Sequence, residues 1–164
     1  MRRLVLFMHT SLDGFVGGPN GEMDWIDVND EMFDYAGQRT READTALYGR
    51  VTYQMMESSW PTAADQPTAT KHDIEHSNWY NSVEIIKLKQ AAGKDIVMFG
   101  RPTVVHALMT EDLIDDYWLF INPVLLGQGI PLFEDIKARA ALRLVTSNVF
   151  SSGVVCPHYE GTPT

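Results

Sequence analysis

The chain has 164 residues, 45% of them apolar, which is enough to bury one hydrophobic core in a single domain spanning residues 1–164. Its formal net charge of −9 argues against a nucleic-acid partner, because phosphate backbones are held by an excess of Lys and Arg. The single cysteine, Cys156, excludes an internal disulfide, and no apolar run is long enough to span a membrane. We therefore expect a cytoplasmic protein with no membrane partner.

The first predicted elements alternate between strand and helix. Residues 3–8 form an apolar run after two arginines, and a central strand fits better than a signal peptide because no small-residue cleavage site follows. Residues 11–24 are rich in glycine and predict a long loop. Asn29 or Asp30 then caps a helix that reaches about residue 43, and residues 45–48 form the next strand.

The middle of the chain is predicted to be mainly helical. Residues 51–58 form a helix after the second strand, and residues 60–70, which include two prolines, form a loop. Residues 71–92 have a helical pattern that breaks near Asn81 and restarts at Ser82.

The last part of the chain returns to strands. Residues 95–99 and 115–122 predict strands on either side of a helix over residues 102–110, and residues 123–134 form a glycine-bearing loop. Alternating apolar residues then predict two strands joined at residues 151–153, which is an antiparallel hairpin. Short strand–helix units followed by a hairpin indicate an α/β fold with a sheet of mixed direction.

Two predicted strands end in Gly-Arg, at Gly49–Arg50 and at Gly100–Arg101, and a helix follows each pair. Glycine lets the backbone approach a ligand, the free N–H groups of the helix favour phosphate, and the arginine adds a forked cation. Strand-to-helix turns are commonly rich in glycine whatever they bind, so one junction alone indicates little. Two junctions, each with its arginine, favour a ligand with a pyrophosphate, such as a dinucleotide.

An ordered set of segments carries a family resemblance, namely residues 7–15, 24–25, 43–53, 94–100, 113–115, 122–133 and the closing hairpin. Together they resemble the dihydrofolate-reductase-like superfamily, and especially stand-alone proteins similar to the reductase domain of bacterial bifunctional riboflavin-biosynthesis proteins. The resemblance implies a mixed, mainly parallel sheet flanked by helices and followed by a C-terminal antiparallel hairpin. It also implies that NADPH binds across the carboxyl ends of the strands.

The resemblance also implies roles for particular residues. Asp13, Trp25 and Phe99 border the substrate pocket, and Asp13 and Trp25 are the catalytic candidates. A turn residue before a glycine, or a core or lid tryptophan, would explain the first two equally well. The implied cofactor-binding positions are Thr10, Gly49, Arg50, Thr52, Gly100, Arg101, Pro102, Thr103 and Val104.

The implied activity is NAD(P)H-dependent reduction of a small heterocyclic or carbonyl substrate by hydride transfer, similar to that of 5-amino-6-(5-phosphoribosylamino)uracil reductase domains. Folate reduction is not expected, because no carboxylate stands where folate reductases use one to protonate the pterin. Relatives of this kind commonly pair, and the apolar hairpin offers a face to cover, so we expect a homodimer.

The chain departs from the family pattern after Asn81. Relatives run through a strand, a loop and a second strand, whereas residues 82–88 here resemble the helix that follows those strands. We therefore expect the sheet to lack two edge strands and residues 45–48 to become its edge. The missing segment would carry the 2′-phosphate contacts of NADPH, which leaves NADH as an alternative cofactor. It also leaves a non-catalytic dimer or ligand-binding remnant as an alternative function.

A motif of a different class lies at His72, Glu75 and His76, whose spacing fits the H-x-x-E-H pattern of inverted zinc peptidases. A zinc hydrolase needs a third ligand from another element, and the sequence shows none. Histidines are also common in polar helix starts, so no metal site is expected here, and a zinc hydrolase is the least favoured of the three alternative functions.

Overall fold

The computed structural model describes residues 2–48, 54, 56, 58–75, 84–85, 93–100, 102–110, 112–134, 136 and 139–162. Their main elements, in chain order, are β1 (Leu4–Ser11), β2 (Phe15–Gly17), α1 (Asp30–Thr40), β3 (Ala43–Tyr48), the 3-10 helix η1 (Trp60–Asp65), β4 (Glu84–Ile85), β5 (Asp95–Phe99), α4 (Pro102–Thr110), β6 (Asp116–Asn122), β7 (Ile130–Pro131), β8 (Leu142–Val149) and β9 (Val155–Gly161). None of the described helices is long and apolar enough to span a membrane.

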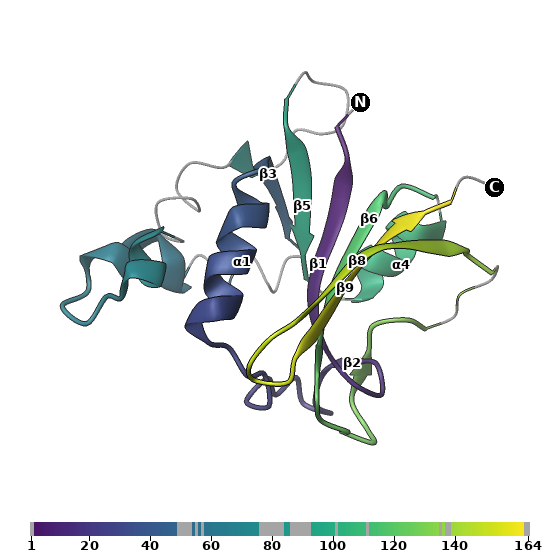
Figure 1. The fold of residues 1–164 in the computed structure, drawn as a ribbon, viewed down its shortest axis with the longest axis horizontal. Helices are drawn as coiled ribbons and strands as arrows, with labels where there is room; N and C mark the ends of the chain where they lie inside the picture. The colour runs from purple at the N-terminus through teal and green to yellow at the C-terminus, as the bar shows by residue number, and fades with distance from the viewer. Residues whose placement is uncertain are drawn as a thin grey trace.

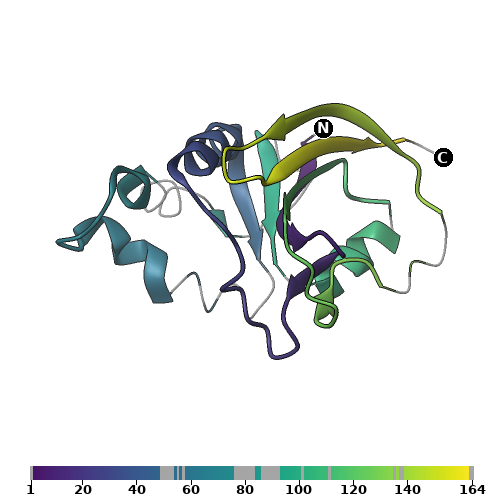
Figure 2. The ribbon, with the colours of Figure 1, turned by 60° about the horizontal axis from the view of Figure 1, so that its bottom comes forward.

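The main sheet is mixed and mostly parallel, with the strand order β4-β3-β5-β1-β6-β9-β8. The strands from β4 to β6 pair in parallel, and β9 and β8 are added antiparallel to the β6 side. Figure 1 shows β8 and β9 as the long yellow hairpin, and Figure 2 shows this hairpin arching over the molecule. The predicted sheet type and the predicted hairpin are both confirmed.

The two faces of the sheet have separate cores, each covered by one helix. Val97 and Phe120 face the core that includes Met32 of α1, whereas the neighbouring Met98 faces the core that includes Val105 of α4. This alternation is what a strand buried on both faces requires. Accordingly, Figures 1 and 2 place α1 and α4 on opposite sides of the strands.

One prediction about the edge of the sheet is wrong. The sequence predicts a helix over residues 82–88, but Glu84–Ile85 form β4, which pairs in parallel with Thr45 and Ala46 of β3. Strand β3 is therefore not the edge, and the expectation that both edge strands are missing is corrected, because β4 lies beyond β3. Ile85 is β-branched and is compatible with a strand as well as with a helix. Pairing with the otherwise open edge of β3 therefore favours the strand conformation.

Smaller differences concern loops and ends of elements. Short strand β2 lies within the expected loop over residues 11–24 and pairs with β7. The 3-10 helix η1 lies within the expected loop over residues 60–70. Helix α1 ends at Thr40 rather than near residue 43, because β3 already begins at Ala43. Most of the helix predicted over residues 51–58 lies outside the described residues.

Candidate functional site

The candidate site is a cleft of about 430 Å³ at the carboxyl ends of β1 and β5. One face of α1 forms a wall of the cleft, and parts of residues 16–28, 56 and 72–75 line the rest. In open α/β sheets, ligands characteristically bind outside the carboxyl ends of the strands. The cleft therefore lies where the fold favours a ligand.

Helix α1 owes its position to a local cap and to its apolar face. The side chain of Asn29 accepts a hydrogen bond from the backbone N–H of Met32 at 3.0 Å, and acidic residues occupy the first turn. Met32, Phe33 and Ala36 follow at helical spacing and line the cleft, and Met32 is also buried against the sheet. The same face thus fixes the helix and shapes the site.

The two Gly-Arg junctions begin at strands that lie side by side. Tyr48 at the end of β3 and Phe99 at the end of β5 are register partners in parallel strands, and their rings stack 5.4 Å apart. Gly100 follows with a φ of 142°, a conformation that favours glycine, and α4 begins at Pro102. Phe99, Gly100 and Pro102 line the cleft. The other predicted members, Gly49, Arg50, Thr52 and Arg101, lie outside the described residues.

Two further predicted cofactor residues lie in the first turn of α4. Thr103 is exposed, and Val104 packs against the core on the α4 side of the sheet. Neither residue lines the cleft. The structure thus places Gly100 and Pro102 in the lining of the cleft, whereas Thr103 and Val104 lie outside that lining.

Asp13, Trp25 and Thr10 are not among the described residues that line the cleft. Thr10 is buried in β1. The indole N–H of Trp25 donates to the backbone oxygen of Glu22 at 3.0 Å. The structure therefore does not gather these three residues with Phe99, Gly100 and Pro102.

The carboxylate of Asp13 is engaged by neighbouring backbone and hydroxyl groups. It accepts hydrogen bonds from the Ser11 hydroxyl at 2.7 Å, from Gly127 N–H at 2.8 Å and from Leu126 N–H at 3.2 Å. These bonds, led by that from Ser11, hold the pKa of Asp13 below its usual range. Asp13 thus joins the turn after β1 to the loop after β6.

His9 is a lining residue that the sequence reasoning missed. It lies near the end of β1, stacks on Phe120 with ring centroids 4.9 Å apart, and borders the cleft. Burial lowers the pKa of His9 to about 4, so its imidazole is neutral at pH 7. A polar residue near the end of an apolar run was the available signal.

Asn122 is a second residue that the sequence reasoning did not single out. Its side chain is fully buried, and its amide N–H donates to the backbone oxygens of Thr10 at 3.2 Å and Phe120 at 3.1 Å. Its side-chain oxygen accepts the backbone N–H of Asp27 at 3.1 Å. One amide therefore ties the ends of β1 and β6 to the loop that leads into α1.

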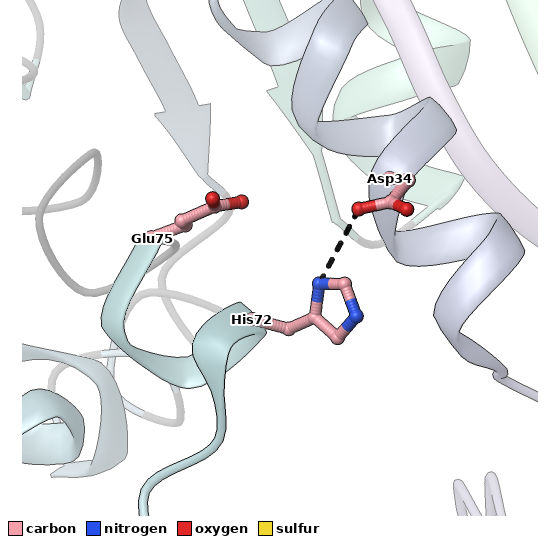
Figure 3. A group of neighbouring side chains, drawn as sticks. All are labelled: Asp34, His72 and Glu75. Carbon is pink, nitrogen blue, oxygen red and sulfur yellow. Dashed lines mark ion pairs between the residues drawn. The ribbon is translucent and has the colours of Figure 1, made fainter.

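His72 and Glu75 line the cleft and lie beside Asp34 of α1, as Figure 3 shows. The His72 ring stacks on Phe33, and its nitrogens lie 3.3 Å from Asp30 and 3.8 Å from Asp34. The Lys71 ammonium lies 3.8 Å from Asp34 and 3.9 Å from Glu75. These contacts form an ion-pair network that holds residues 71–75 against α1. The third member of the zinc motif, His76, lies outside the described residues.

A second group, Asp116, His158 and Glu160, lies on the hairpin side of the sheet. Arg3 holds Asp116 through two hydrogen bonds, at 2.5 and 2.8 Å, and Arg143 pairs with Glu160. This cluster is therefore a network of ion pairs that joins strands β6, β8 and β9 to Arg3, the residue before β1.

The strand order, the two helix-covered faces and the cleft at the carboxyl ends define an α/β protein of the dihydrofolate-reductase-like fold. Dihydrofolate reductase of Enterococcus faecalis, described as complexed with NADP(H), superposes with a TM-score of 0.60 and 12% identity, over 98% of this chain and 97% of that one. A pyrimidine reductase-like protein of Corynebacterium diphtheriae superposes with a TM-score of 0.67 and 16% identity, over 99% of this chain and 93% of that one.

Sequence comparison narrows the class to a family. Residues 80–156 match the RibD C-terminal domain. An uncharacterized Bacillus subtilis protein, YyaP, is 33% identical over 94% of this chain and 92% of its own length. The chain belongs to the RibD C-terminal domain family, and the resemblance stated from the sequence is confirmed.

Proposed function

We propose that the chain is an NAD(P)H-dependent reductase that acts on a small substrate in the cleft beside α1. The observation that carries the proposal is the pairing of Tyr48 with Phe99, because it sets the ends of two strands, each followed by Gly-Arg, next to each other. The second of these ends lines the cleft through Phe99, Gly100 and Pro102. Membership of a reductase-domain family supports the same reaction class.

The described residues fit a dinucleotide at this edge of the sheet. Gly100 has a φ that favours glycine, and the first turn of α4 offers backbone N–H groups to a phosphate. Arg50, Arg101 and Thr52, which lie outside the described residues, would add cations and a hydroxyl donor, and the exposed Thr103 would add a second hydroxyl beside the cleft. When bound, the nicotinamide supplies the hydride, and the chain supplies binding, orientation and exclusion of water. NADPH is the cofactor we propose, with NADH as the alternative.

His9 and Phe99 are the residues we assign to substrate orientation. Both line the cleft beside the strand ends, and His9 is neutral there, so it offers one N–H donor and one acceptor rather than a charge. Asp13 and Trp25 stay predicted catalytic residues, but Asp13 has an evident role in joining two loops.

The test is a titration of the protein with NADPH and with NADH, followed by tryptophan emission. We expect saturable binding, and we expect Arg50→Ala to weaken it by about 1.5–3 kcal/mol, which is typical of a hydrogen bond to a charged group. Arg139→Ala is the matched control, since Arg139 is an exposed arginine that precedes β8 at the far side of the sheet. If neither cofactor binds at millimolar concentration, the reductase proposal fails and the non-catalytic ligand-binding alternative replaces it.

A further inference from the structure

The cleft is unusually rich in sulfur-containing side chains. The chain has eight methionines. Four of them line this one cleft: Met8, Met23, Met32 and Met56. Methionine is flexible and polarizable, so it adapts to the outline of an apolar ligand and makes favourable contacts with aromatic rings. This composition points to an aromatic occupant.

Flat aromatic surfaces complete the lining. Phe99 lines the cleft from the sheet, and Phe33 lines it from α1, where the ring stacks on His72; Phe120 also borders the cleft but is only 1% exposed. Offset and edge-to-face packing against such rings stabilises a planar ligand beyond its area of contact. The volume of about 430 Å³ lies within the roughly 300–1,000 Å³ usual for small-molecule sites.

Part of this apolar lining is open to water. Met23 and Val28 line the cleft and are each 43% exposed. Apolar side chains that remain exposed inside a concave site are those that a ligand would cover.

The charges beside Phe33 disfavour an anion at that end of the cleft, because Asp30 and Asp34 lie next to the His72 ring that stacks on Phe33. Glu75 lines the cleft, and Figure 3 shows Asp34 of α1 beside His72 and Glu75, although Asp34 is not itself a lining residue. Lys71 is within ion-pair distance of both carboxylates. Among the described lining residues, Arg41 alone carries a permanent positive charge. It follows the last residue of α1 and stands eight residues after Phe33, which is roughly 12 Å along the helix axis.

From these observations we infer that the cleft takes an uncharged, flat aromatic substrate that carries no phosphate. The inference rests on the proposed function, because it names the substrate class of the same site. It departs from the phosphoribosyl substrate that the family resemblance implies. The acidic network near Phe33 and the methionine lining favour a neutral ring over a sugar phosphate.

The test compares two ligands that differ only by a phosphate, 1-naphthol and 1-naphthyl phosphate. Both are titrated into protein labelled with ¹³C at the methionine methyl groups. We expect 1-naphthol to shift the resonances of Met8, Met23, Met32 and Met56, while Met98 and Met109, which belong to the core on the α4 side, stay in place. We also expect 1-naphthol to bind at least tenfold more tightly than its phosphate ester. Equal or tighter binding of the ester, or no shift at the four cleft methionines, overturns the inference.

A pair of surface variants localises the effect. Met23→Gln removes an exposed apolar contact without adding charge and is expected to weaken 1-naphthol binding about fivefold. Leu125→Gln, at a residue that is 69% exposed and does not line the cleft, is expected to leave it unchanged. Equal effects of the two variants count against the cleft as the binding site.

The nicotinamide titration separates this inference from the proposed function. If 1-naphthol binds at the four methionines but no nicotinamide cofactor binds, only the proposed reductase activity fails. If a cofactor binds but the phosphate ester competes as well as 1-naphthol, only the inferred substrate class fails.

Discussion

The carboxylate of Asp13 is surrounded by donors from two parts of the chain, the turn after β1 and the loop after β6. We expect Asp13→Ala to lower the melting temperature at pH 7, because the N–H groups of Leu126 and Gly127 lose their acceptor. Since the folded pKa of Asp13 is depressed, its contribution is present above the unfolded value near 3.8 and is lost as the pH falls through the folded pKa. The difference from wild type should therefore narrow below about pH 4.

The control for this prediction is Asp24→Ala, which removes another exposed carboxylate from the segment between β1 and α1. Thermal unfolding followed by circular dichroism at pH 7 and pH 3 checks both variants. A loss of turnover by Asp13→Ala with an unchanged melting temperature would instead support the catalytic role predicted from the family resemblance.

His9 gives a second prediction at the scale of a single residue. Its pKa falls from 6.5 to about 4 on burial, and each pKa unit corresponds to roughly 1.4 kcal/mol. The folded state therefore disfavours the charged imidazole. The contribution of neutral His9 to the free energy of unfolding is fully present above pH 6.5 and is lost as the pH falls toward 4. His9→Phe keeps an aromatic ring on Phe120 but cannot be protonated. We therefore expect the free energy of unfolding of this variant to fall by about 3 kcal/mol less than that of wild type on acidification.

Urea unfolding of wild type and His9→Phe at pH 7.5 and pH 4.5 measures this difference, and other titrating groups cancel because both proteins contain them. An imidazole that titrates near pH 6.5 by NMR, with no difference between the two proteins, would contradict the burial of His9.

At the scale of elements, α1 depends on its cap. Asn29→Ala removes the acceptor of the Met32 N–H and should lower the free energy of unfolding by about 1 kcal/mol, as is typical of N-caps. Asn29→Asp keeps the acceptor and is the control, so it should stay near wild type. Chemical unfolding measures both values. Equal losses in the two variants would show that the Ser151 contact of Asn29, and not the cap, is what matters.

Elements with strong local signals were predictable with their bounds. β5 and α4 begin and end where the sequence predicts, because an apolar run ends in glycine and Pro102 fixes the first turn of the helix. β4 was not predictable, because its two residues take their conformation from a partner strand far away in the chain. Strand β2 was not predicted for the same reason, since it forms only through pairing with β7.

The site residues also differ in whether they could be predicted, according to whether they carry a local sequence signal. Gly100 and Pro102, which line the cleft, were predicted from the local pattern of a strand-to-helix turn, and Phe99, which also lines it, was predicted from the family resemblance. His9 and Asn122 were not found, because their importance comes from burial and from contacts between distant segments. The packing of residues 71–75 against α1 could not be predicted from the sequence either, since it depends on contacts between distant residues such as His72 and Phe33.

At the scale of the whole molecule, the sheet ends in a strand that is almost entirely exposed. β8 is the last strand in the sheet order, and its side chains Leu144 and Val149 are 52% and 71% exposed. The opposite end does not offer the apolar β3 edge expected from the sequence, because β4 covers it. The hairpin is therefore the face we expect to form a homodimer, since one self-complementary patch serves both subunits.

Sedimentation at micromolar concentration should give twice the chain mass of 18.5 kDa. Leu144→Lys combined with Val149→Lys should give a folded monomer, because two cations placed on each copy repel across a two-fold axis. Leu12→Lys, at an exposed leucine in the turn after β1, is the control and should remain dimeric. A wild-type monomer contradicts the dimer itself. A dimer that survives the double substitution contradicts only the choice of the hairpin face, because the pairing surface must then lie elsewhere on the chain.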